Sequence, residues 1–456
     1  MRNHTLRPLV PFTLFVASAI GLSFAGAVDM NLLVAIGIVA ILIGALLAEN
    51  AEEYWSTIFE FFGSRTAVTA TLLWLIVGIY GAILKEGHIV EGLVWAAHEL
   101  NIGAAAFTVV VFLFSSLFAI STGSGFGTIS AMSITLFPAG ILLGGNPALL
   151  GGAILSGAAL GDSIAPISDT AVIAASTQAY QNREMVADIG GTVRNRLLFV
   201  GIAMVVTLIL FTGLGILESG GSASGVTHHD NVLQPHGLAM LLPTLLVVLL
   251  SFHRINIFIS LFAGILSATF IGWAFHLFDI SLLLQIEQGK VSGAVVDAIA
   301  GMSNICILLM VVVSLSGIII RSGCMDNIIG KLNTRIIHSK RSAELTIFSL
   351  VSLAGILIAA VNTIANICIA PFVNSIGQQH GLHPYRRTTL LATIICTFPF
   401  ILPYGGCVLL LQKGVEASAC GANIQVSDVF LTALYPWVLF VVMLIACLTG
   451  YKRTIP

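Results

Sequence analysis

One short stretch sets the architecture of this chain: Gly161-Asp162-Ser163-Ile164-Ala165-Pro166-Ile167-Ser168-Asp169-Thr170. It holds two carboxylates, and no other Asp, Glu, Lys or Arg occurs between Glu99 and Arg183. An ionisable residue at membrane depth costs roughly 3 kcal/mol on insertion scales, so it marks a functional site. Pro166 removes a backbone donor and clashes with the preceding helical turn, which predicts that a helix breaks here. Because a broken membrane helix is tolerated where it lines a cavity, the stretch predicts an ion or substrate site.

The composition is that of a polytopic membrane protein. The chain has 456 residues, of which 57% are hydrophobic and 9% are charged, and its mean hydropathy is +1.02. A soluble globular protein carries about 25% charged residues. Many apolar stretches reach the roughly 20 residues that are needed to cross a bilayer. The seven cysteines show no CxxC spacing, which favours buried free thiols over a disulfide or metal framework.

The apolar pattern predicts an all-α fold of about ten transmembrane helices and two re-entrant hairpins. The crossings are expected at 9–27, 32–48, 66–84, 147–180 (broken), 197–217, 237–251, 255–277, 304–320, 386–412 (broken) and 428–449. The hairpins are expected at 103–141 and 343–376, where two apolar arms flank a tip of small and polar residues. The first apolar segment is expected to be a retained helix rather than a cleaved signal peptide, because a second apolar segment follows at once.

The distribution of basic residues supports this topology. With both termini in the cytoplasm, sixteen of the nineteen Lys and Arg residues fall on the cytoplasmic side, and only Lys85, Lys290 and Lys413 fall outside. This is a strong positive-inside bias. Treating either hairpin as two crossings would invert every later loop and remove much of the bias. The expected location is the plasma membrane, the inner membrane of a bacterium.

The two halves of the chain repeat one pattern. A hairpin followed by a proline-broken helix occurs twice, and Pro166 of the first break corresponds to Pro403 of the second. We expect two repeats at 1–217 and 237–456, joined by an outer linker at 218–236. Each repeat holds five crossings, an odd number, so the second is inserted upside down. Inverted repeats with paired broken helices place the site near the bilayer midplane.

The breaks and the hairpin tips supply oxygen ligands for a cation such as sodium. The expected cation ligands in the first break are Asp162, Asp169, Ser163, Ser168 and Thr170. The expected substrate contacts elsewhere are Thr122, Ser124, Gly125 and Thr128 at the first tip, Asn362, Thr363 and Asn366 at the second tip, and Thr397 and Tyr404 at the second break. Several of these have a structural alternative: Asp169 could cap the following half-helix, and the tip residues could cap the hairpin arms.

The stretch 161–170 resembles the "GD-x-x-(S/A)-P-(L/I)-S-D-T" signature of the NhaC family of sodium/proton antiporters. The stretch 122–128 is similar to the family's upstream "TGTS-(W/F)-GT" motif. The resemblance implies the hairpin-and-broken-helix fold of the wider ion-transporter superfamily. This chain has Ser163 where many members have Lys, and its second break, 398–404, lacks the polar Asn that is usual there.

The leading hypothesis is a sodium/proton antiporter in which a carboxylate holds either ion. Sodium is then the transported or coupling ion, with no cofactor and no enzymatic activity. The alternative is a sodium- or proton-coupled carrier of a small organic solute such as an amino acid or carboxylate, which the aromatic second break favours. An intramembrane aspartyl protease and a channel are weaker alternatives. The expected partners are the ions, the lipid bilayer and no nucleic acid, and a homodimer is left open.

Overall fold

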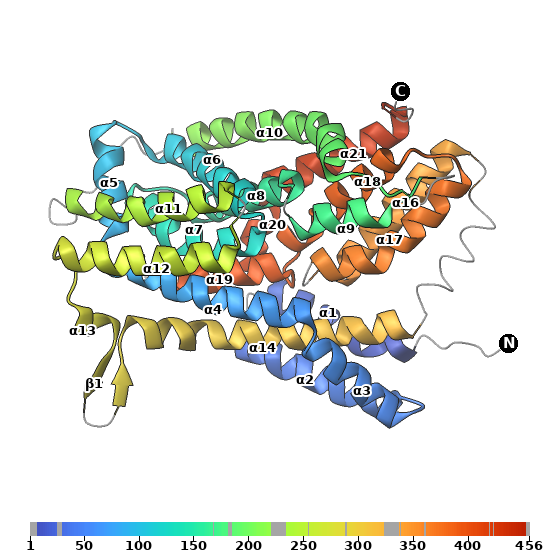
Figure 1. Ribbon diagram of the computed structural model, residues 1–456, viewed down its shortest axis with the longest axis horizontal. Helices are drawn as coiled ribbons and strands as arrows, with labels where there is room; N and C mark the ends of the chain where they lie inside the picture. The colour runs from blue at the N-terminus through green and yellow to red at the C-terminus, as the bar shows by residue number, and fades with distance from the viewer. Residues whose placement is uncertain are drawn as a thin grey trace.

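The fold is built almost entirely from long apolar helices that run along the longest axis of the molecule (Figure 1). The structure, a computed structural model, describes residues 7–24, 30–166, 168–180, 185–219, 234–253, 255–287, 290–322, 337, 339–359, 362–418, 420–422 and 424–452. Within these ranges, seven helices are long and apolar enough to cross a membrane, or eight if one bent pair is a single span. The predicted all-α polytopic membrane fold is confirmed, and the count of ten crossings stays a prediction.

The first half of the chain contains a hairpin of two helices followed by a broken helix. Its elements are η1 (Arg7–Leu9), α1 (Val10–Phe24), α2 (Met30–Leu47), α3 (Ala51–Phe62), α4 (Arg65–Glu86), α5 (Ile89–Glu99), α6 (Ala104–Thr122), α7 (Gly125–Leu142), α8 (Pro147–Ile164), α9 (Asp169–Thr177) and α10 (Ile189–Ser219). At the tip between α6 and α7, Gly123 adopts a φ of 66°, a left-handed conformation that suits glycine. Ser124 then caps α7 by accepting the N–H of Gly127.

The second half repeats this arrangement after a short hairpin of strands. Its elements are η2 (Pro235–Met240), α11 (Leu241–Phe252), α12 (Ile257–Ala274), α13 (Ile280–Leu283), β1 (Gln285–Glu287), β2 (Lys290–Ser292), α14 (Ala294–Arg321), α16 (Lys340–Leu357), α17 (Asn362–Gln379), α18 (Pro384–Ile395), η3 (Phe398–Phe400), α19 (Gly406–Ser418), α20 (Val426–Thr432) and α21 (Leu434–Thr449). The strands pair antiparallel. The bent pair of possible spans is α20 and α21, which meet at 47°.

The two hairpins occupy opposite halves of the molecule. In Figure 1, α6 and α7 lie in the left half, α16 and α17 lie in the right half, and the break between α8 and α9 lies between them. This placement is the one expected for inverted repeats. The repeat boundaries at 1–217 and 237–456 stay a prediction, and most of the linker at 218–236 lies outside the described residues.

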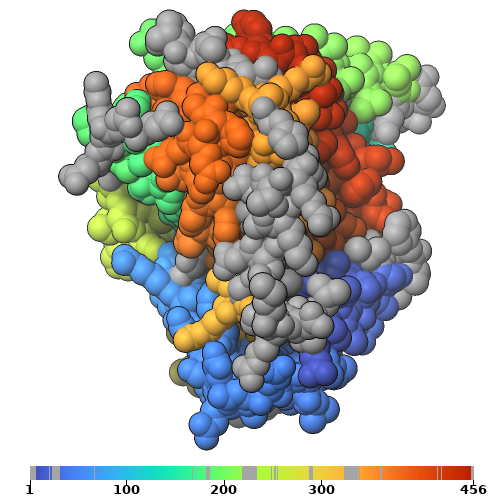
Figure 2. All heavy atoms as spheres, turned by 90° about the vertical axis from the view of Figure 1, so that its right-hand side faces the viewer, coloured from blue at the N-terminus to red at the C-terminus, as the bar shows by residue number. Residues whose placement is uncertain are grey.

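The start of α1 and the end of α21 lie at the same end of the molecule (Figure 1). Figure 2 shows this end, with the orange helices α16 and α17 near its centre, the red C-terminal helices to one side and the blue α3 and α4 below. Helices that are far apart in the sequence therefore share this surface.

Two connecting segments form regular structure. Residues 51–62 form α3, in which Asn50 caps the first turn and the Tyr54 hydroxyl donates to the carbonyl of Ile41. The segment before α14 carries the short strands β1 and β2, and α14 begins at Ala294.

Candidate functional site

The predicted helix break is present. Helix α8 ends at Ile164, and Ala165 and Ser168 adopt extended backbone conformations before α9 begins at Asp169. Pro166 lies within this gap, where it removes no helical hydrogen bond. The break is held on one side by α17, which packs against α9, and on the other by α6, which packs along α8. The break therefore has a buried side, with Asp162, Ser168 and Thr170, and an exposed side, with Pro166 and Asp169.

The carboxylate of Asp162 lies at the centre of the break and is 8% exposed. Its Oδ1 accepts a hydrogen bond from the Ser168 hydroxyl at 2.5 Å. Its Oδ2 accepts from Nδ2 of Asn362 at 2.7 Å and lies 3.7 Å from the Cys396 thiol. Because Ser168 gives its proton to Asp162, the Thr170 hydroxyl donates to Ser168 at 2.7 Å. Four segments of the chain thus converge on one buried carboxylate.

The side-chain amides of Asn362 and Asn366, on α17 of the second hairpin, each use the nitrogen for a hydrogen bond near the break and leave the oxygen without a donor among the described residues. Nδ2 of Asn366 donates to the carbonyl of Thr170 at 3.0 Å, much as Asn362 donates to Asp162. The Oδ1 atoms of Asn362 and Asn366 are both buried and have no hydrogen-bond donor among the described residues. Buried acceptors are normally satisfied, so two unpaired amide oxygens beside a carboxylate are unusual. They are the ligand type that a hard cation binds.

Asp169 lies in a different environment from Asp162. Its side chain is exposed, and its Oδ2 lies 3.5 Å from the Thr363 hydroxyl, at the edge of hydrogen-bonding distance. It occupies the first turn of α9, where the helix dipole favours a carboxylate. The structure therefore places one aspartate in the buried centre of the break and the other at its solvent-facing edge.

The first hairpin tip satisfies its hydroxyl groups locally. Thr122 donates to the carbonyl of Phe118, and Thr128 donates to the carbonyl of Ser124. Gly125 lies against Phe400, since a Cβ there would stand 2.9 Å from the Phe400 ring. These interactions cap the two arms of the hairpin and fix its packing. No hydrogen bond joins this tip to Asp162 among the described residues.

The hydroxyl of Ser163 also points away from the break. It donates to the carbonyl of Ala159 one turn earlier in α8, at 2.6 Å. This is the common local hydrogen bond of a serine inside a helix. Of the five cation ligands expected in the first break, Asp162, Ser168 and Thr170 form one hydrogen-bonded cluster.

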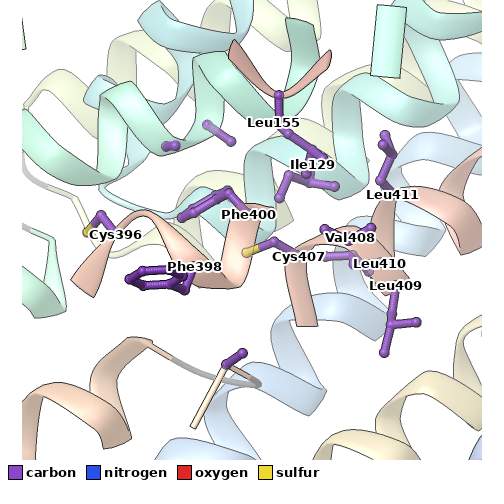
Figure 3. Packing of buried hydrophobic residues seen from close by; sticks show 14 of the residues in the cluster. Ile129, Leu155, Cys396, Phe398, Phe400, Cys407, Val408, Leu409, Leu410 and Leu411 are labelled. Atoms are coloured by element: carbon purple, nitrogen blue, oxygen red, sulfur yellow. The ribbon is translucent and has the colours of Figure 1, made fainter. Parts of the chain in front are cut away.

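The second break is packed rather than open. Phe398 and Phe400 are buried, and Figure 3 shows both rings on the segment that leads from Cys396 into α19. Phe400 lies toward the side chains of α7 and α8, whereas the Phe398 ring lies against Phe440, with centroids 5.5 Å apart. Thr397 donates to the carbonyl of Ile394, and the Tyr404 hydroxyl donates to the carbonyl of Ile356. The aromatic residues that favoured an organic solute therefore join the second break to the hairpins.

Three arginines that the sequence pattern assigned to cytoplasmic loops are fully buried: Arg196, Arg386 and Arg387. The spacing of the buried residues Thr192, Phe199 and Ala203 on α10 puts Arg196 on the helix face that packs inward. That spacing is the signal that could have found it. Cys396 was also missed, because a lone cysteine in an apolar segment carries no distinguishing pattern. No cluster of three or more His, Cys, Asp or Glu side chains suited to a metal occurs among the described residues.

These features define a polytopic membrane protein with a buried ionisable site in a helix break. Residues 7–216, slightly less than half of the chain, match the model of the Na+/H+ antiporter family. Over this part the chain is similar to that family, and the predicted resemblance to NhaC proteins is confirmed.

The curated proteins that this chain resembles are also named as antiporters. The chain is 25% identical over 320 residues to the Na(+)/H(+) antiporter NhaC of Alkalihalophilus pseudofirmus, covering 66% of each protein. It is 29% identical over 205 residues to a malate-2H(+)/Na(+)-lactate antiporter of Bacillus subtilis, covering 44% of this chain and 42% of that protein. The matches thus span about half to two thirds of these relatives' length. Among solved structures, the Alcanivorax borkumensis YdaH transporter is 13% identical with a TM-score of 0.47, covering 98% of this chain and 100% of that one.

Proposed function

We propose that this protein exchanges sodium ions for protons across the membrane, with Asp162 as the carboxylate that holds either ion. The observation that carries the proposal is the buried cluster at the break, where Asn362 donates to Asp162 and Asn366 donates to the carbonyl of Thr170. Each of these two amides keeps an oxygen that lacks a donor among the described residues. The family match and the antiporter named among the relatives support the same activity.

Two sets of ligands can neutralise the carboxylate. Sodium is held by Asp162 at the end of α8 together with Oδ1 of Asn362 and Oδ1 of Asn366, which both lie on α17. A proton is held by reversing the hydrogen-bond chain: Asp162 donates to Ser168, Ser168 donates to Thr170, and Thr170 turns toward the carbonyl of Asp162, 3.3 Å away. Only one of the two ions fits at a time, because each takes the same carboxylate.

This competition is sufficient for exchange. An ionised carboxylate without a partner is costly to move through a low-dielectric environment. The site therefore changes sides when it holds sodium or a proton and stays in place when it is empty. Asp169, at the exposed edge of the break, is proposed to attract cations to the site rather than to bind them in its centre. The bacterial inner membrane and cytoplasmic termini are the proposed setting.

Proteoliposomes with an internal pH dye test the proposal. A proton gradient is imposed, sodium is added, and the dye response is compared for wild type, Asp162→Asn and Asp169→Asn. The two variants each remove one carboxylate from the same break. We expect no sodium response for Asp162→Asn and a retained response with weaker apparent sodium affinity for Asp169→Asn. A wild-type rate in Asp162→Asn would overturn the proposal.

A second candidate function is favoured by a different observation. Arg196 carries a buried positive charge near the break, which suits an organic anion better than a bare cation. The relative named a malate-2H(+)/Na(+)-lactate antiporter is consistent with this candidate.

A further inference from the structure

Within the part of the chain that the structure describes, the side chain of Arg196 has no hydrogen-bond partner. It lies in α10 with 0% exposure, and Nε, Nη1 and Nη2 all lack an acceptor among the described residues. A guanidinium carries five N–H donors and keeps its charge in proteins. Burying such a group without partners is among the most costly arrangements in a protein interior, so its position needs a specific explanation.

The other two buried arginines show how this fold normally satisfies the same group. Nε of Arg386 donates to Oε1 of Glu344 at 2.8 Å, and its Nη2 donates to the carbonyl of Ala446. Arg387 donates to the side chain of Asn374 and to the carbonyl of Ala179, both at 2.6 Å. Arg196 is thus the exception among three arginines that are equally buried in neighbouring helices.

Arg196 lies on α10, which packs against the helices that form the candidate site. Asp162 on α8, Cys396 after α18 and Tyr435 on α21 all lie close enough to interact with its charge. No carboxylate of the described residues lies within 4.0 Å of it, so Asp162 is a neighbour and not an ion-pair partner. The helices that carry these residues all pack against α10. The guanidinium therefore lies within electrostatic range of the Asp162 carboxylate, on a separate helix that packs against α8.

We propose that Arg196 binds the carboxylate group of a small organic anion that occupies the break together with the cation. The planar guanidinium matches a carboxylate with two parallel hydrogen bonds. Its charge is cancelled by the solute's carboxylate, while the charge of Asp162 is cancelled by sodium or a proton, so the loaded site is neutral. This inference rests on the proposed cation site and names the solute class that would accompany the ion.

Thermal unfolding of the purified full-length protein in detergent tests the binding step. Acetate, lactate, malate and succinate are added at constant sodium chloride, with acetamide and lactamide as neutral matches. We expect at least one carboxylate, and neither amide, to raise the unfolding temperature of wild type by several degrees. Arg196→Met should lose this shift, and Arg196→Lys should weaken the apparent affinity at least tenfold. Arg194→Met, an exposed residue on the same helix, is the matched control and should keep the shift.

The unfolding temperature without carboxylate gives an independent readout. Removing an unpartnered buried charge should leave Arg196→Met at least as stable as wild type. Arg386→Met breaks the buried pair with Glu344 and should be clearly less stable. A strongly destabilised Arg196→Met would contradict an unpartnered guanidinium.

Three further results would overturn the proposal. In the first, no carboxylate raises the unfolding temperature of wild type; in the second, a carboxylate raises it equally in Arg196→Met. In the third, replacing chloride with sulfate, without any carboxylate, raises the unfolding temperature of wild type by the same amount. These outcomes are separate from failure of the cation site. If Asp162→Asn keeps sodium-driven proton movement while the carboxylate shift still depends on Arg196, the cation proposal fails and the anion site stands.

Discussion

Nδ2 of Asn362 lies 2.7 Å from Oδ2 of Asp162, although the two residues are 200 positions apart in the chain. Asn362 begins α17 of the second hairpin, and Asp162 lies in the last turn of α8 beside the first break. The bond joins the two repeats at the residue that carries the proposed ion. Oδ1 of the same Asn362 amide is buried and has no hydrogen-bond donor in the described structure.

We predict that Asn362→Ala weakens sodium binding without unfolding the protein. The variant removes an oxygen ligand and a hydrogen bond to an ionised group, which is worth about 1.5–3 kcal/mol. That energy corresponds to roughly a 10- to 100-fold rise in the sodium concentration for half-maximal exchange. Ser375→Ala, an exposed position on the same helix, should behave as wild type in the same proteoliposome assay. An unchanged sodium dependence in Asn362→Ala would remove this residue from the site.

Gly161→Ala should disrupt the protein, because α8 and α6 approach closely at this point. A Cβ on Gly161 would lie 2.1 Å from Cβ of Ala119 and 2.6 Å from its carbonyl carbon, so backbone would have to move. Overpacking of this kind typically costs 1–3 kcal/mol. Gly201→Ala on α10 is the control, since a Cβ there meets nothing within 4 Å. Unfolding temperatures and monodispersity on size-exclusion chromatography compare the two, and equal values would contradict the close approach.

Acid should destabilise the start of α10 through Asp188, which lies just before the helix and outside the membrane-spanning segments. Hydrogen bonds from the Tyr385 hydroxyl and from the N–H of Gly191 lower the pKa of Asp188 below its ordinary value. A carboxylate with a lowered pKa contributes stability at neutral pH, and this contribution is lost as the pH falls below about 4.

Tyr385→Phe removes the larger of these two causes. The fall in unfolding temperature between pH 6 and pH 3 should therefore be smaller in Tyr385→Phe than in wild type. Tyr451→Phe, an exposed tyrosine near the end of the described chain, should keep the wild-type fall. The same pH dependence in all three proteins would show that the Tyr385 bond does not affect Asp188.

Much of the fold could be predicted because membrane helices are long and apolar. The break at Pro166 was predictable because proline disrupts a helix. Asn362 and Asn366 were predictable as site residues because they are polar and lie at the tip of the second hairpin. The structure places both amides at the first break. Each of these features depends on a short local pattern, which can be read from one sequence without knowing the tertiary structure.

The remaining features depend on how the helices pack against one another in the folded protein. Arg196 resembled a cytoplasmic residue because it stands near other arginines, and only the packing of α10 against α8, α18 and α21 buries it. Ser163 and Thr128 were candidates by proximity in sequence, but their hydroxyls bond to carbonyls of their own helices. Side-chain direction within a helix follows from tertiary contacts that spacing alone does not fix.

The bond between Asp162 and Asn362 has a consequence for biosynthesis. The ribosome delivers the aspartate to the membrane long before it makes the asparagine, so the newly inserted first half lacks the amide that later holds its carboxylate. Quality-control proteases and membrane chaperones would meet this incomplete intermediate on every round of synthesis. A mutation at Asn362 would then prolong the intermediate's life, and its effect would be seen in protein abundance as well as in transport.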